Sequence, residues 1–426
     1  MGDPLTADWL RAQRWFRSKQ RPIDSLAEVD RALLSDHVAL AVIEVTYTNG
    51  GARDRYLLPM LDDAEPADGD GAWRTMVGAI ADDASVGGAH GTFVASRTDA
   101  LDTLLPSARE AAAALDERRL RVEQSNTSIV LGERLILKLY RLLEPGMSPD
   151  LEVSAFLTDA GFADTPSVAG SIVYDAPDAE PAAAAMLQAF VPSTGDAWGA
   201  ILEALATDAA RATEMAAAIG RLTVRMHEAL ASRPDDPAFP AGVASVGETA
   251  GWRALAESQL AQAVSALSGE AHDRLVEVAP DVTARFADAF GRATGDEIVT
   301  RIHGDYHLGQ LLARADGGFS VIDFEGEPAR PLAERRTPSS PLRDVAGMLR
   351  SLDYAARTAA RRSGLDADAW LAEARAAFLA QYGVSGALVD AFELEKACYE
   401  VRYEASNRPD WVWLPLAAVE RLARPS

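Results

Sequence analysis

The feature of this sequence that most limits its fold is a change of pattern near residue 192. Before it, stretches of alternating apolar residues such as 38–47 and 55–61 are separated by turn signals such as 49–51. After it, the chain is rich in alanine and has the periodicity of helices, interrupted by a strand-like stretch over 298–322. This segregation predicts an α+β fold with a sheet-rich amino-terminal half and a helical carboxyl-terminal half.

Several local elements are predicted within the amino-terminal half. Residues 121–140 are expected to form two strands of a hairpin around Gly132, and residues 149–160 a short helix. Residues 101–120 have a helical pattern, and we interpret the alanine run at 182–185 as helix-forming composition.

The pattern divides the chain into three parts. We expect an amino-terminal cap subdomain over residues 1–89, a β-rich intermediate subdomain over 90–191, and a mainly helical lobe over 192–426. Of the residues, 48% are hydrophobic, which is enough to bury large cores.

Charge and cysteine content limit the possible partners. The formal net charge is −23, which repels the phosphate backbone of nucleic acid and anionic membranes, so neither is an expected partner. No apolar run approaches the roughly 18 residues that span a bilayer. The single cysteine, Cys398, cannot form an intramolecular disulfide, and no basic-then-apolar leader is present. We therefore expect a cytoplasmic protein, whose oligomeric state the sequence does not indicate.

The sharpest motif lies in two nearby segments. Residues 302–311 read IHGDYHLGQL and residues 321–325 read VIDFE, which places Asp305, Gln310 and Asp323 on what we expect to be two apolar strands. Phosphoryl transfer needs a carboxylate to accept the proton of the nucleophile and oxygen ligands that hold Mg²⁺ between phosphates. The pattern predicts that Asp305 is the base and that Gln310 and Asp323 bind the metal of Mg-ATP.

A structural role is the alternative for each aspartate alone. Asp305 would then cap a turn after Gly304, and Asp323 would end a strand. The two motifs together, at this distance, favour the functional interpretation.

These segments resemble the Brenner motif and the metal-binding aspartate of the aminoglycoside-phosphotransferase-like kinases. The likeness extends along almost the whole chain to the actinobacterial maltokinases. It implies a bilobal fold like that of the eukaryotic protein kinases, with an additional cap. The residues that carry it are 13–16, 123–128, 137–138, 149–152, 303–310, 322–328, 340–347 and 399–411.

The resemblance also implies nucleotide-binding residues. Lys138 would reach the ATP phosphates from an apolar strand and would pair with Glu152; the alternative is a lysine that extends from a strand edge into solvent. A turn without glycine stands where kinases carry a glycine-rich phosphate loop. The expected phosphate-binding residues are Lys138, Gln124, Ser125, Asn126, Thr127 and Ser128; the adenine hinge would include Gln188, Phe190 and Val191; and His303, Arg343 and Asp344 would support the site.

A carbohydrate hydroxyl is the acceptor that the resemblance implies. The residues expected to contact the sugar are Asp305, Tyr306, His307, Glu400, Glu404, Trp411 and Trp413. The alternative for the last four is a helix that exposes Glu400 and Glu404 to solvent and is packed at its end by the tryptophans.

One departure bears on which sugar is bound. Residues 411–416 read WVWLPL where maltokinases tend to read WLPIPL, so that the indole of Trp413 would close the space of a second glucose ring. Tyr306 replaces the usual leucine. A nearby carboxylate would suit an ammonium group, so the chain resembles the glucosamine kinases, which phosphorylate the 6-hydroxyl. The alternatives are a maltokinase that forms maltose 1-phosphate and a sugar- or nucleotide-sensing module without turnover.

A metalloprotease is excluded. His227-Glu228 begins the pattern of that class, but residue 231 is alanine and the second histidine is missing. We expect His227 to lie on a helix surface.

Overall fold

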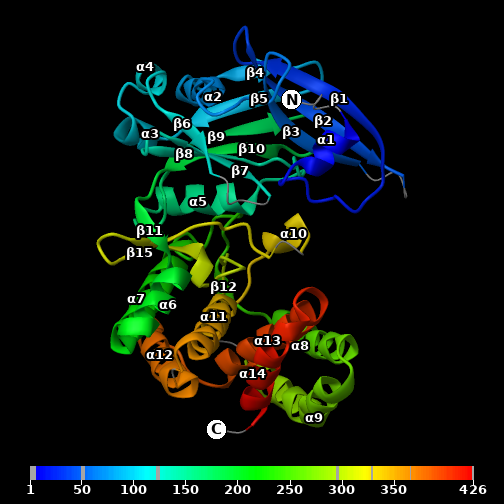
Figure 1. The fold of residues 1–426 in the computed structure, drawn as a ribbon, viewed down its shortest axis with the longest axis vertical. Coiled ribbons are helices and arrows are strands. Elements are labelled where there is room, and N and C mark those ends of the chain that lie inside the picture. Colours follow the sequence, from blue (N-terminus) through cyan, green and yellow to red (C-terminus); the bar gives the residue numbers. More distant parts are fainter. Residues whose placement is uncertain are drawn as a thin grey trace. The chain divides into compact units, whose positions relative to one another are not determined.

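The computed structural model describes residues 6–48, 53–120, 125–293, 297–327, 330–364 and 366–424. The turn predicted at residues 49–51 lies outside these ranges. The chain divides into two compact units, Met1–Pro192 and Ser193–Ser426 (Figure 1). We refer to them as the amino-terminal and carboxyl-terminal units.

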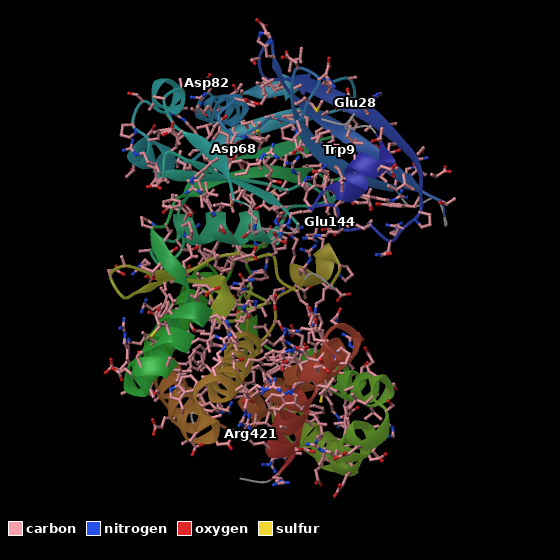
Figure 2. The ribbon with its side chains drawn as sticks, in the orientation of Figure 1. Trp9, Glu28, Asp68, Asp82, Glu144 and Arg421 are labelled. Atoms are coloured by element: carbon pink, nitrogen blue, oxygen red, sulfur yellow. The ribbon has the colours of Figure 1, made fainter. Side chains whose placement is uncertain are left out.

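The amino-terminal unit begins with helix α1 (Ala7–Ala12) and a three-stranded antiparallel sheet of β1 (Ile23–Leu33), β2 (Val38–Tyr47) and β3 (Arg53–Leu61). The predicted strands 38–47 and 55–61 are confirmed as β2 and β3. Both faces of β2 are buried, because alternate residues belong to different cores. One core contains Trp15 and Phe16 on the segment after α1, and Trp9 within α1, labelled in Figure 2, packs against it.

A seven-stranded sheet forms the rest of this unit. Its order is β4 (Ser85–Gly87), β5 (Thr92–Arg97), β9 (Val168–Asp175), β10 (Ala182–Ala189), β8 (Leu135–Leu139), β7 (Thr127–Leu131) and β6 (Glu117–Arg119). The helices of the unit are α2 (Ala72–Ala81), α3 (Asp99–Leu104), α4 (Ala108–Ala112) and α5 (Pro149–Asp159). The predicted hairpin is confirmed as β7 and β8, with Gly132 at a φ of 57°, and the helix predicted at 149–160 as α5.

Two predictions for this unit are wrong. Residues 101–120 do not form one helix, because Pro106 and the left-handed Ser107 (φ 56°) separate α3 from α4, and β6 follows. The alanine run at 182–185 belongs to β10, which pairs with β8 and β9 on its two sides. Pairing on both edges overrides the helical preference of alanine.

The carboxyl-terminal unit is mainly helical. Its helices are α6 (Ala197–Thr207), α7 (Ala209–Leu230), α8 (Val246–Ala266), α9 (Gly269–Arg292), α10 (Leu332–Arg335), α11 (Leu342–Ser363), α12 (Ala367–Tyr382), α13 (Ala387–Asn407) and α14 (Trp413–Ala423), with 3₁₀ turns η1 (Leu308–Gln310) and η2 (Pro409–Trp411). Its strands are β11 (Ser193–Asp196), β12 (Gly242–Val243), β13 (Ile298–Val299), β14 (Leu311–Arg314) and β15 (Phe319–Val321). In the described part of the chain, no helix combines the length and apolar character needed to cross a membrane.

The strand-like stretch 298–322 contains three short strands rather than two long ones. Segment 300–307 between β13 and η1 is irregular, and β14 pairs with β15. The prediction that Asp305, Gln310 and Asp323 stand on strands is therefore wrong: they lie in the segments that flank the strands. Glycine and polar residues in these segments favour turns over ladder pairing.

Candidate active site

Asp305 lies in the irregular segment 300–307. Its Oδ1 is 3.8 Å from Nζ of Lys396 on α13, and both side chains are about one third exposed. The ring of His303 connects this segment to the one that follows β15. Its Nδ1 accepts from the backbone N–H of Asp305 (3.4 Å), and its Nε2 donates to the carbonyl of Ile322 (3.0 Å). His303 is buried, and its role in supporting the site stays a prediction.

Asp344 holds the backbone that leads to Asp305. Its carboxylate accepts the N–H of His303 (2.8 Å) and that of Gly304 (2.9 Å), together with Nε2–H of His227 (3.0 Å). Burial raises the pKa of Asp344, but the hydrogen bond from His227 and the other favourable contacts outweigh it and leave the pKa below the ordinary value. Asp344 lies in the first turn of α11, which begins after Pro341, where the sequence predicts a helix to start.

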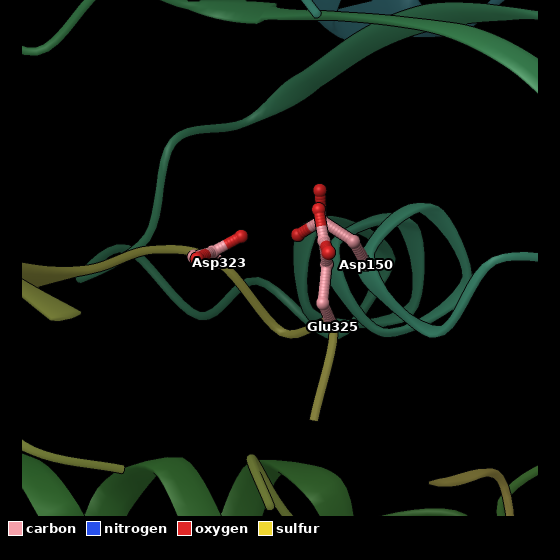
Figure 3. A group of neighbouring side chains, drawn as sticks. All are labelled: Asp150, Asp323 and Glu325. Carbon is pink, nitrogen blue, oxygen red and sulfur yellow. The ribbon is translucent and has the colours of Figure 1, made fainter. Parts of the chain in front are cut away.

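Asp323 and Gln310 meet at the other side of this irregular region. Nε2 of Gln310 donates to Oδ2 of Asp323 (3.2 Å). Asp323 has a φ of 69°, a conformation that non-glycine residues adopt at a cost and that is concentrated at functional sites. Figure 3 shows its carboxylate and that of Glu325 on the segment after β15, and Asp150 on α5. A carboxylate beside an amide is a ligand set that fits Mg²⁺. The ligands would be the carboxylate of Asp323 and the amide oxygen of Gln310.

The two residues after Asp305 face inward. Tyr306 is 2% exposed, and its hydroxyl is 3.0 Å from Oγ1 of Thr223 on α7. The predicted contact of its side chain with a sugar is therefore wrong, because the side chain fills the interior of the unit. His307 accepts the N–H of Gly309 (3.0 Å) through Nδ1 and so begins η1. Burial lowers the pKa of His307, and its contact with substrate stays a prediction.

A pocket opens beside segment 300–307. Gly304 and Gly326 line it, as does Tyr399 on α13. Its charged lining residues include Glu327, Arg330, Arg343, Glu395 and Lys396. A pocket with carboxylates and cations in alternation suits a small ligand that carries both hydroxyl and charged groups.

Glu327 is a carboxylate of this pocket that lies close to two cations, Arg330 and Lys396. Its Oε2 accepts from Nε of Arg330 at 2.7 Å. Burial raises the pKa of Glu327, but Lys396, Arg330 and the hydroxyl of Tyr399 lower it below its ordinary value. The carboxylate is therefore anionic at neutral pH.

Arg343 forms another wall of the pocket. It donates to both oxygens of Glu395 (2.8 and 3.0 Å) and lies over the ring of Phe392. The aromatic face helps to fix this ion pair, and the supporting role of Arg343 stays a prediction.

Glu400 and Glu404 are not exposed, so the alternative that places them on a solvated helix face is wrong. Glu400 accepts from Nε of Arg350 (2.8 Å), and burial raises its pKa. Glu404 accepts from Arg408 (2.9 Å) and from the hydroxyl of Tyr354 (3.1 Å). The described lining of the pocket does not include either carboxylate.

The two tryptophans that follow are half-buried. Cation–π contacts place Arg361 at 5.0 Å from the ring centroid of Trp413 and 5.9 Å from that of Trp411. Neither ring lines the described pocket. Their role in sugar binding, like that of Glu400 and Glu404, stays a prediction.

The amino-terminal unit holds Lys138 in β8, where the sequence predicts it. Its Nζ lies 2.8 Å from Oδ2 of Asp150 on α5, and both side chains are buried. The hydroxyl of Tyr140 donates to the same oxygen (2.9 Å). The acidic partner identified by this contact is Asp150, two positions before the predicted Glu152, which is half-buried on the same helix. The alternative of a solvent-directed lysine is wrong.

The structure describes only part of the predicted phosphate turn. Gln124 lies outside the described residues, Ser125 and Asn126 form a bend, and Thr127 and Ser128 are buried in β7. Oγ1 of Thr127 accepts from Nε of the buried Arg141 (2.8 Å). Phosphate binding by this segment stays a prediction.

The predicted adenine hinge lies at the end of β10. Gln188 is in the strand, and the N–H of Phe190 donates to the carbonyl of Arg134 (2.8 Å) just before Val191. The assignment of these residues to an adenine hinge stays a prediction.

Comparison with known protein families divides the chain between residues 91 and 98 and not at Pro192. A family model described as the maltokinase N-terminal cap domain matches residues 9–91, and one described as the phosphotransferase enzyme family matches residues 98–387. The chain belongs to the phosphotransferase enzyme family. The expected kinase-like fold, with its cap and helical carboxyl-terminal region, is confirmed.

Several glucosamine kinases are similar to this chain. This chain is 33% identical over 331 residues to a glucosamine kinase of Streptacidiphilus jiangxiensis, covering 72% of this chain and 73% of that protein. It is 29% identical to a glucosamine kinase of Mycolicibacterium smegmatis, covering 72% and 79%. A solved glucosamine kinase in complex with glucosamine, ADP and inorganic phosphate is 25% identical, covers 99% of this chain and all of that chain, and has a TM-score of 0.75.

Sequence reasoning missed several residues of this phosphotransferase site. Segment 149–152 contains two acids, Asp150 and Glu152, and the sequence does not show that Asp150 contacts Lys138. Lys396 lies just before Tyr399 with no local signal, because α13 brings it to Asp305 from a distant part of the chain. His227, expected on a surface, is buried against Asp344.

Proposed function

We propose that this protein is an ATP-dependent glucosamine kinase, which transfers the γ-phosphoryl group to the 6-hydroxyl of glucosamine. The observation that carries the proposal is Asp305, on a clamped backbone at the edge of a charged pocket. The glucosamine kinases among the relatives support the choice of sugar.

The chemistry assigned to Asp305 is that of a general base. The carboxylate accepts the proton of the attacking hydroxyl as the bond to phosphorus forms. Lys396 beside it holds an anionic carboxylate in place and adds positive charge next to the incoming phosphate. In the amino-terminal unit, Lys138 orients the nucleotide phosphates, and its pair with Asp150 fixes its ammonium group.

Asp323 and Gln310 would hold the Mg²⁺ of Mg-ATP, and Glu325 lies on the same segment as Asp323. When bound, the ion neutralises charge that develops on the phosphates. The hydrogen bond between Gln310 and Asp323 keeps the two ligands side by side before the ion arrives.

The pocket supplies the sugar site, and Glu327 is its ammonium-binding group. An anionic carboxylate rewards an amine more strongly than a hydroxyl, because the pair is charge-assisted. Glu327 is anionic at neutral pH for the reasons given above. Glucosamine is therefore favoured over glucose.

The first experiment measures ADP release from Mg-ATP with separate solutions of glucosamine, N-acetylglucosamine, glucose and maltose, beside a control without sugar. We expect release with glucosamine, little with glucose and least with N-acetylglucosamine, whose amide has no positive charge. The product phosphate is then located on the 6-oxygen by NMR.

A maltokinase is the second candidate, because the model of the maltokinase cap matches residues 9–91. Faster release with maltose than with glucosamine would replace the first proposal by this one. Binding of Mg-ATP without turnover on any of these sugars would favour a sensing module.

A further inference from the structure

A buried histidine that the proposed mechanism does not use is linked through Asp344 to segment 300–307. We call this segment, which carries the proposed base, the catalytic segment. His227 on α7 is 5% exposed, so it is neither a surface residue nor in contact with substrate. Its Nε2 is 3.0 Å from Oδ2 of Asp344, and its Nδ1 is 2.8 Å from the hydroxyl of Tyr382. Both ring nitrogens are thus engaged.

The partners fix the tautomer of this ring. The carboxylate of Asp344 is anionic, since its pKa lies below the ordinary value, and can only accept a hydrogen bond. Nε2 of His227 therefore carries the proton. In the neutral form of the ring, Nδ1 is then an acceptor to which the hydroxyl of Tyr382 can donate.

This chain of contacts ends at the base. Oδ2 of Asp344, which His227 touches, also accepts the N–H of His303, while Oδ1 accepts that of Gly304. Gly304 has a φ of 82° and directly precedes Asp305. Rotation of the Asp344 carboxylate would release both backbone hydrogen bonds and with them the position of the base.

The packing of α7 explains why the histidine is held firmly. A side chain at Gly220 would collide with the backbone carbonyl of Phe378, so α7 and α12 approach closely at that point. This approach brings Tyr382, at the end of α12, to His227. One turn before His227, Thr223 contacts the hydroxyl of Tyr306, so the same face of α7 touches the catalytic segment at a second place.

We propose that His227, oriented by Tyr382, is a positioning residue that holds the Asp344 carboxylate and through it the backbone carrying Asp305. The effect is on kcat, because a displaced base weakens the transition state, while ground-state binding of sugar and ATP is made elsewhere. The proposal rests on the phosphotransferase function proposed above.

The test compares His227→Leu, His227→Gln and Tyr382→Phe with the unmodified protein. The leucine removes the donor to Asp344, whereas the glutamine side chain can supply an N–H at a similar distance. We expect kcat of His227→Leu to fall by about tenfold to a hundredfold, as for other residues that orient a catalytic group, with both KM values within about threefold. His227→Gln should recover most of the loss. His272→Leu, at an exposed histidine on α9, is the matched control and should keep full kcat.

A second readout does not need turnover. In protein labelled with ¹⁵N-histidine, the His227→Gln spectrum identifies the signals of His227. We expect a protonated Nε2 and an unprotonated Nδ1, and a displaced Nδ1 signal in Tyr382→Phe. If the unmodified protein phosphorylates none of the sugars, the proposed function fails while this readout still tests the hydrogen-bond chain.

Three results would overturn the proposal: a folded His227→Leu with unchanged kcat; equal kcat losses in the leucine and glutamine variants with equal drops in melting temperature; or His227 in the opposite tautomer.

Discussion

At the scale of single residues, the proposed base depends on neighbours that the local sequence does not specify. Asp305 faces Lys396 from α13, and its backbone is held by Asp344 from α11. The motif around Asp305 and Asp323 was sufficient to predict a phosphotransferase. It could not predict the partners, because contacts between distant segments leave no local period or spacing.

Replacement of the base gives the first prediction. In Asp305→Asn the side chain keeps its size but no longer accepts a proton, so we expect kcat to fall by about 10²–10⁴-fold. The melting temperature should change little, since Asp305 is partly exposed. Steady-state ADP release with glucosamine is the measurement, and turnover near that of the unmodified protein would refute the role of base.

The second prediction concerns Glu327, the carboxylate proposed to bind the ammonium group. In Glu327→Gln the charge is lost while hydrogen bonding is partly retained, so we expect KM for glucosamine to rise by about tenfold or more and KM for glucose to change far less. Glu334→Gln, at another carboxylate that lines the pocket, serves as the comparison. An equal rise of KM for both sugars would show that Glu327 does not read the amine.

At the scale of elements, local pattern predicts some segments and tertiary contacts decide others. β2 and α5 were predicted almost to the residue, because an apolar run or a proline with helical period is a local property. β10 was not, since alanine favours a helix and only pairing with β8 and β9 makes it a strand. β1 was missed because its apolar residues do not alternate regularly with polar ones.

The element scale also contains a carboxylate that joins two sheets. Asp30 in β1 is buried and accepts the N–H groups of Ala89 (2.6 Å), His90 (3.1 Å) and Gly91 (2.7 Å), and the hydroxyl of Tyr174 in β9 (2.8 Å). Burial raises the pKa of Asp30, but these hydrogen bonds outweigh it, and the pKa lies below the ordinary value. The ionised form is therefore the one that stabilises the fold.

The third prediction concerns Asp30→Asn, which loses the charge and acceptor capacity. We expect the free energy of unfolding to fall by about 2 kcal/mol at neutral pH, because buried N–H groups lose their partner. A lowered pKa in the folded state means that the contribution is present above about pH 4 and is lost as pH falls through the folded value. Urea unfolding at several pH values measures it. A difference between the two proteins that grows toward acid would contradict the assignment.

At the scale of the whole molecule, the described fold consists of two compact units joined near Pro192. The sequence predicts a change of character at the same place. It also predicts Lys138 in the first unit and Asp305 with Asp323 in the second. The pocket, which combines segments around residues 302, 327, 343 and 396, depends on the folding of the carboxyl-terminal chain as a whole.

The fourth prediction concerns nucleotide and metal. We expect Mg-ATP to bind the native protein and so to raise its melting temperature. By mass action, a concentration a hundredfold above Kd should stabilise the protein by about 2.7 kcal/mol. Excess EDTA should remove most of this shift, and Asp323→Asn should reduce it. Differential scanning fluorimetry measures all three. An undiminished shift with EDTA would show that the metal is not needed for binding.

The two-sided burial of β2 has a consequence for protein engineering. Because alternate residues of this strand belong to separate cores, the cap contributes part of the interior of its neighbour. A chimera that receives residues 9–91 from another family member would have to match the surfaces of Leu40 and Val42, and also the hydrogen bond that Tyr174 outside the cap donates to Asp30. Recombination is therefore expected to succeed at the boundary after Pro192 more readily than at the boundary after the cap.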